Sequence, residues 1–302
     1  MKEFSPRTLD DLRAEWPPAL EHVSATSLKM WMRCPEQWRR RYVLGERTPP
    51  AAALIQGRAD HTAIAENFEY KLGEGEDLPT VEVAARFSEV FETEIDREGG
   101  YGEVDWGEPN ASAKERRRLA ARVKDRGVEL VSMYRDQVAP WLYPESVETG
   151  FEIPAGDLPV AVLGFIDLVA FDVNPFHAPG ESGVVPDTLK IVERKTAARK
   201  QIQPEWNVQV LVYQQARPLD VDFHLSVKQN MQYVAWADPK WRVAYTDTTR
   251  QRGALLVQQL VGAIGLTYQQ YGPDSPWPGH GLNHPWACGY CGYAPSCWWR
   301  RP

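Results

Sequence analysis

The sequence has few cysteines and no long apolar run. Its 302 residues include only four cysteines. No apolar stretch approaches the ~18 residues that span a bilayer. The first residues, MKEFSPRTLDDLRAEW, place acidic side chains where a signal peptide has a basic and then an apolar stretch. We therefore expect no membrane partner and a cytoplasmic location, where structural disulfides are rare.

An excess of positive charge is also missing. The chain has 34 Lys and Arg residues against 41 Asp and Glu residues, a formal net charge of −7. This excludes a nucleic-acid coat that is driven by overall positive charge, but not nucleic acid held at one site by metal ions and a local basic patch. Arg39 to Arg41 and Arg116 to Arg118 are two basic runs that could contact a phosphate backbone, and a solvated helix face explains each run equally well.

The chain lacks internal repeats and low-complexity tracts, so its organisation follows from hydrophobic periodicity. Helices are expected at 24–45 with a bend at Pro35, at 54–71, at 81–94, at 113–139, after Pro204 and at about 250–271. Strands are expected as a pair over 151–173, at 189–196, near 223–236 and at 241–246. Helices on either side of a short block of strands predict a mixed α/β core rather than a doubly wound sheet.

Three charged residues stand out in the strand segments. Asp167 lies in the otherwise apolar string LGFIDLVAF, where a carboxylate is costly unless it is paired, hydrogen-bonded or bound to metal. Glu193 and Lys195, in IVERK, share one face because side chains two residues apart on a strand point the same way. If the strands are neighbours, Asp167 and Glu193 meet and need a cation such as Mg²⁺ or Mn²⁺. Taken alone, however, Glu-x-Lys occurs by chance in most chains of this length.

Two helices add polar side chains. His61, in IQGRADHTAIAENF, could supply a nitrogen ligand to the same metal. Gln209 and Tyr213 share a face of the helix NVQVLVYQQA and could reach a phosphate or orient the reacting groups. Each feature also has a plain structural explanation. A lone histidine is often a surface or core-satisfied residue, and Gln and Tyr often border the packed Val and Leu residues of a helix.

The four cysteines are unevenly placed. Cys288, Cys291 and Cys297 form C-x2-C-x5-C near the end of the sequence, whereas Cys34 lies almost a whole chain upstream. Three thiols separated by Gly, Pro and small residues are typical of metal ligands, with Cys34 as the fourth and His284 as a weaker substitute. The spacing leaves zinc and a [4Fe–4S] cluster equally open. Buried structural cysteines are the remaining explanation.

Taken in order, the motifs resemble those of the RecB-like and Cas4-like branch of the PD-(D/E)XK nuclease superfamily. The matching strings are RCPEQWRRRYVLG with Cys34, GRADH with Gly57 and His61, GFID with Asp167, ERK with Glu193 and Lys195, QVLVY with Gln209 and Tyr213, and the terminal cysteine triplet. Each motif is weak alone, but the ordered set is specific and spans about residues 24–298. The resemblance implies an α/β, restriction-endonuclease-like core, in which helices flank a mixed central sheet, with a helical insertion.

The resemblance also implies roles for these residues. His61, Asp167 and Glu193 would bind Mg²⁺ or Mn²⁺ with help from the backbone carbonyl of Arg194, and Lys195 would position or activate the attacking water. Gln209 and Tyr213 would lie near the DNA and the active site. Cys34, Cys288, Cys291 and Cys297 would hold a [4Fe–4S] cluster that staples the N-terminal helix to the C-terminal tail. A single nuclease domain over 1–302 is implied, with N-terminal helices at 24–71, a helical insertion at 72–140, a nuclease core at 150–250 and a cysteine-rich tail at 272–302.

The implied function is a metal-dependent DNA nuclease, an exonuclease acting on single-stranded ends. The chain lacks the phosphate-binding motif G-x-x-x-x-G-K-[ST], so a helicase or recombination partner would be a separate chain. One alternative is a non-catalytic DNA-binding or scaffold module on a nuclease fold, although such a module has no physical need for the buried polar set. The other is a zinc-stapled interaction protein.

Overall fold

The fold is described from a computed structural model. It describes Trp16 and residues 20–174, 183–197, 207–227, 232–233, 242–279, 288–289 and 291–300. His284, the substitute metal ligand considered above, lies outside these residues. None of the helices in the described ranges combines the length and the apolar character that a bilayer span requires.

The core of the described chain is a mixed sheet of seven strands. The strands are β1 (His22–Val23), β2 (Leu142–Pro154), β3 (Ala161–Asp172), β4 (Lys190–Ala197), β5 (Val221–Val227), β6 (Gln232–Tyr233) and β7 (Arg242–Val243). Their order is β1-β3-β4-β5-β6, with β2 also paired to β3 and β7 to β5. β3 runs antiparallel to β2 and β4, whereas β4 and β5 are parallel. This mixed sheet confirms the predicted α/β class.

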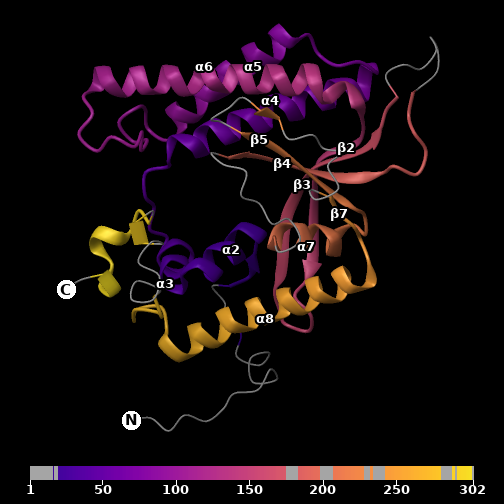
Figure 1. The fold of residues 1–302 in the computed structure, drawn as a ribbon. Coiled ribbons are helices and arrows are strands. Elements are labelled where there is room, and N and C mark those ends of the chain that lie inside the picture. Colours follow the sequence, from indigo (N-terminus) through magenta and orange to yellow (C-terminus); the bar gives the residue numbers. More distant parts are fainter. Residues whose placement is uncertain are drawn as a thin grey trace.

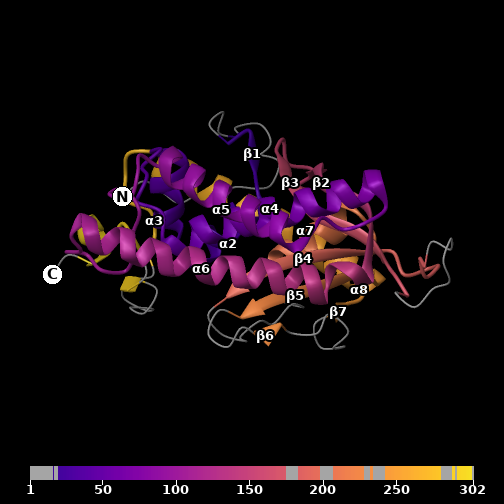
Figure 2. The ribbon, with the colours of Figure 1, turned by 90° about the horizontal axis from the view of Figure 1, so that it is seen from above.

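Three long helices cover one face of the sheet. They are α4 (Ala52–Glu74), α5 (Thr80–Arg97) and α6 (Ala113–Gln137), which lie above the strands in Figure 1 and nearest the viewer in Figure 2. Their apolar side chains form one core with Leu168 of β3 and Val192 of β4. The contact between α5 and α6 depends on Gly127, because a Cβ there would lie 2.0 Å from the ring of Phe87.

The other side of the sheet carries α2 (Ala25–Arg33), α7 (Val208–Ala216) and α8 (Asp247–Tyr271) (Figure 1). Two apolar clusters hold this layer. One joins α2 and α8 to Val162 of β3, and the other joins Val210 and Tyr213 of α7 to Ile191 of β4. β4 is therefore covered on both faces, which places its side chains alternately toward α7 and toward α4 and α6.

The segment that follows α2 lies beside the C-terminal tail. After α2 come α3 (Pro35–Trp38) and a π-helical turn, η1 (Arg39–Val43), and the C-terminal segment lies beside α3 in both overall views (Figures 1 and 2). Glu36 and Arg39 form a buried ion pair, and both bind the tail. Glu36 accepts a hydrogen bond from the Trp277 amide at 2.7 Å, and Arg39 donates to the Pro273 carbonyl at 2.7 Å. Trp38 stacks on Trp277.

Some boundaries differ from the sequence expectations. The predicted bend at Pro35 is confirmed, since α2 ends at Arg33 and a new helical turn starts at Pro35. β2 begins at Leu142, well before the expected residue 151. Pro144 argues against a strand there, and the chain accommodates it with a register shift between Pro144 and Ser146.

Candidate active site

The predicted acidic residues meet where two strands separate. β3 and β4 are paired only from Ala170 opposite Lys190 to Leu168 opposite Val192. The next residues along each strand are Asp167 and Glu193, so the two carboxyl groups face each other just beyond the last ladder pair. One backbone contact spans the opening, because the Arg194 amide donates to Asp167 Oδ2 at 3.4 Å. The sheet thus creates a polar gap inside an otherwise apolar layer.

His61 enters this gap from α4. Its Nδ1 lies 3.4 Å from Asp167 Oδ2, and its side chain is 28% exposed. Burial, followed by the positive charge of Arg194, lowers the pKa of His61 to about 4. The imidazole is therefore neutral at physiological pH and offers a lone pair to a cation.

Glu148, which sequence reasoning did not identify, completes this cluster. It lies on β2 between Val147 and Thr149, which pair with Leu168 and Ile166, so it stands opposite Asp167. In the part of the chain that the structure describes, His61, Glu148 and Asp167 are the one group of three or more metal-binding side chains with ligand atoms within 4.8 Å of one another.

Two further properties distinguish Glu148. Desolvation, and then the neighbouring Asp167, raises its pKa to about 7. Its φ of 45° is rare for a residue other than glycine. No sequence motif marks this glutamate, because its role depends on a strand pairing that the sequence does not predict at this position.

The charge balance of the site favours a bound cation. Burial raises the pKa of Asp167 and of Glu193, which is fully buried, and the neighbouring Asp167 raises the pKa of Glu193 further. Lys195 contacts Glu193 directly and offsets part of this cost. Burial alone would lower the pKa of Lys195, but Glu193 and Asp167 outweigh burial and raise it, so the amine stays protonated. Lys195 faces several acids, and a divalent cation would stabilise this arrangement further.

Gln209 and Tyr213 reach the same site from α7, as their helical spacing predicts. Gln209 Nε2 lies 3.3 Å from Glu193 Oε2 and 2.7 Å from the Tyr213 hydroxyl oxygen. The other end of this amide accepts a hydrogen bond from Lys29 Nζ of α2 at 2.9 Å. Burial, followed by the charge of Lys195, lowers the pKa of Lys29 to about 8. Lys29 is a second residue that the sequence motifs did not identify.

Arg194 points to the opposite face of β4. Its Nη2 binds Asp60 Oδ2 of α4 at 2.8 Å, and its guanidinium lies 4.2 Å from the ring centre of Tyr134 of α6. Both members of this ion pair are buried. The pair fixes α4 against β4, and it thereby positions His61, the residue that follows Asp60. The predicted role of the Arg194 carbonyl as a metal ligand stays a prediction.

The four cysteines lie around one small cavity. Cys34 stands between α2 and α3, whereas Cys288, Cys291 and Cys297 come from the tail, and all four are partly buried with free thiols. Desolvation raises the pKa of Cys291 and Cys297, and the proximity of the other cysteines raises that of Cys291 further. Buried thiols that are brought together in this way become thiolates when a cation binds them. The sulfur atoms from the two chain ends do converge.

In the first basic run, Arg39 and Arg40 make contacts within the fold and do not form an open basic surface. Arg39 is buried in its pair with Glu36. Arg40 binds Glu46 and the Ser296 hydroxyl, and it packs over the ring of Tyr293. These contacts join α3 and η1 to the tail, so the expectation that Arg39 and Arg40 contact a phosphate backbone is not supported by their surroundings. The second run lies on the first turns of α6, where Arg117 and Arg118 are exposed.

The comparison with protein families identifies the class to which this chain belongs. The PD-(D/E)XK nuclease superfamily matches residues 22–298, and the chain belongs to this superfamily. Membership implies a metal-dependent nuclease that hydrolyses DNA. Among solved structures, the crystal structure of SSO0001 aligns over 92% of this chain and 96% of its own, at 13% identity and a TM-score of 0.33. The comparison with curated proteins found no match.

Proposed function

We propose that this protein is a DNA exonuclease of the RecB-like and Cas4-like branch, acting on single-stranded ends. The observation that carries the proposal is the convergence of His61, Asp167, Glu193 and Lys195 in one polar gap, reached from α4, β3 and β4. A neutral imidazole with nearby carboxylates is a donor set that suits Mg²⁺ or Mn²⁺. Glu148 adds a carboxylate to the ligands that the motifs imply.

The chain's own groups have distinct tasks in this proposal. A divalent cation bound by these ligands would polarise the scissile phosphate and lower the pKa of a bound water. Lys195, held protonated by two acids, orients that water and offsets the negative charge that develops on the phosphate. Gln209 keeps Glu193 and Tyr213 in place through its amide, and Lys29 holds the other end of that amide. The low pKa of His61 keeps its ring nitrogen available as a ligand.

We also propose a [4Fe–4S] cluster at the four cysteines. The gathering of Cys34, Cys288, Cys291 and Cys297 around one small cavity supports a shared metal centre, and the resemblance favours a cluster over zinc. The cluster would be structural, because it joins α2 and α3 to the tail at a distance from the carboxylates. Brown, iron-containing protein that absorbs broadly near 400 nm is the expected result of anaerobic purification. Colourless protein that contains zinc would refute the cluster.

End-labelled DNA tests the nuclease proposal. Wild type, Lys195→Ala, Asp167→Ala and the control Lys114→Ala, an exposed lysine on α6, are incubated with Mn²⁺ or Mg²⁺. Linear single strands carry the label at the 5′ end or the 3′ end, and a circular single strand serves as a substrate without ends. Wild type and Lys114→Ala should degrade only the linear strands, and the two site variants should be inactive. Equal degradation by all four proteins would refute the proposal.

A further inference from the structure

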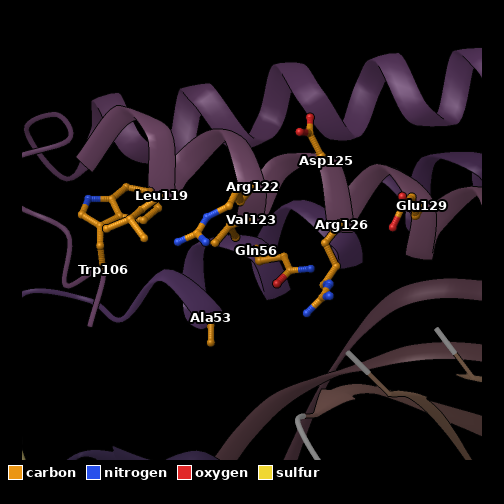
Figure 3. A pocket seen from close by; sticks show the side chains of 9 residues that line it. All are labelled: Ala53, Gln56, Trp106, Leu119, Arg122, Val123, Asp125, Arg126 and Glu129. Carbon is orange, nitrogen blue, oxygen red and sulfur yellow. The ribbon is translucent and has the colours of Figure 1, made fainter. Parts of the chain in front are cut away.

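A cavity lies between α4 and α6, outside the carboxylate site. Its volume is about 630 Å³. Gln56 and Ala53 of α4 form one side, and Arg122 and Arg126 of α6 form another, as Figure 3 shows. Trp106 borders the same cavity near Arg122 (Figure 3). The sequence motifs assign no role to these residues.

The amide of Gln56 faces this cavity without a protein partner. The residue is only 3% exposed, and its Nε2 donates no hydrogen bond within the described part of the chain. Buried polar groups in proteins almost always have a partner. A buried donor on the wall of a cavity therefore points to an acceptor that arrives with a ligand.

Arg122 and Arg126 supply positive charge to the same space. They are one helical turn apart and both exposed, and neither forms an ion pair with any residue in the described ranges. Other arginines of this layer are paired, for example Arg86 with Glu66 and Arg58 with Glu94. Two carboxylates, Asp125 and Glu129, also border the cavity. In Figure 3 the Asp125 side chain points up from α6, whereas that of Arg126 points down into the open space.

The position of the cavity relates it to the proposed active site. Gln56 lies one helical turn before Asp60, which binds Arg194, the residue between Glu193 and Lys195. His61 follows Gln56 by five positions on α4, a rise of about 7.5 Å along the helix axis, which corresponds to roughly one or two nucleotides of an extended strand.

We propose that this cavity binds the backbone phosphates of a single nucleic-acid strand and guides that strand to the metal site. Arg122 and Arg126 contact successive phosphates, and the Gln56 amide donates to a phosphate oxygen. The inference rests on the proposed nuclease function and adds a path for the substrate to it.

Binding and cleavage are measured separately to test this. In the Lys195→Ala background, a fluorescein-labelled single strand of about 20 nucleotides is titrated with protein at several salt concentrations, and its anisotropy is followed. Arg122→Ala with Arg126→Ala should weaken binding roughly tenfold and reduce the slope of log K against log salt by about 1.4, for two lost phosphate contacts. The matched control is Arg250→Ala with Arg252→Ala, two exposed arginines on α8.

Further variants separate charge from fold. Arg122→Lys with Arg126→Lys should keep the salt slope, since both charges remain, and Gln56→Leu should weaken binding while leaving the slope unchanged. Equal affinity and equal slope for the two alanine pairs would overturn the inference, as would the absence of any binding. Either of these binding results would leave the proposed nuclease function standing if wild type cleaves DNA and Lys195→Ala does not. Arginine-dependent binding without any cleavage by wild type would instead refute the nuclease function alone.

Discussion

Replacing Asp167 by Asn tests the claim that the site is built for a cation. Asn has almost the same shape, and its carbonyl oxygen can still accept the hydrogen bond from the Arg194 amide. Burial raises the pKa of Asp167 and of Glu193 above their unfolded values, so the metal-free protein loses stability as pH rises from the unfolded pKa values through the folded ones. At neutral pH without metal, Asp167→Asn should therefore melt at a higher temperature than wild type.

Added Mn²⁺ should reverse the order of the two melting temperatures, so that wild type melts above Asp167→Asn. A ligand at 100 times its Kd stabilises the native state by about 2.7 kcal/mol, which for a chain of this size corresponds to roughly 5 °C in Tm. Wild type should gain that amount with Mn²⁺ in excess over EDTA. The Tm of Asp167→Asn should rise much less, because the variant lacks one charged metal ligand. It also lacks the repulsion between carboxylates that the cation relieves in wild type.

Thermal unfolding at pH 7.5, followed by circular dichroism, compares the two proteins with and without Mn²⁺. Glu152→Gln, which removes an exposed carboxylate from β2, serves as the control and should behave as wild type in both conditions. The reasoning would be refuted if the Tm of wild type did not change with Mn²⁺, or if Asp167→Asn showed the full increase in Tm.

Three further predictions concern separate parts of the molecule. His61 has a pKa of about 4 in the folded protein against 6.5 when unperturbed, so the free energy of unfolding should fall as pH drops from 6.5 toward 4 in EDTA. His61→Gln should remove about 3 kcal/mol of this loss in urea titrations, and an unchanged pH profile would contradict the assignment. Asp60→Ala removes the carboxylate that pairs with the buried Arg194 and should cost about 3–5 kcal/mol in the same titrations. Cys291→Ala should lose the iron of the proposed cluster and lower the Tm, and full retention of iron with an unchanged Tm would refute the structural role of Cys291 in that cluster.

Much of the fold was predictable because its signals are local. Apolar periodicity marks the long helices, and β-branched runs mark β3 and β4, so the mixed α/β core follows from the sequence. The gathering of His61, Asp167, Glu193 and Lys195 was expected only through the order of their motifs. Chemistry alone left a lone histidine and a Glu-x-Lys pair unremarkable.

The parts that sequence reasoning missed depend on contacts between distant segments. Glu148 joins the site because β2 extends back through Pro144, a residue that usually ends a strand. Lys29 joins it because α2 packs beside α7, which places its amine against Gln209. Arg39 was expected at the surface because three arginines in a row resemble a solvated face. The structure instead buries it against Glu36, a pairing that no hydrophobic pattern reveals.

The contacts that Glu36 and Arg39 make with the tail connect the tail to the proposed active site through α3 and α2. They seat α3 against Trp277, and α3 directly follows α2, whose Lys29 holds the Gln209 amide beside Glu193. A protein cut just before Pro273 would lose this support as well as its three terminal thiols. Such a protein should show impaired turnover even with every carboxylate intact, so an inactive C-terminal truncation would be a poor guide to where the chemistry occurs.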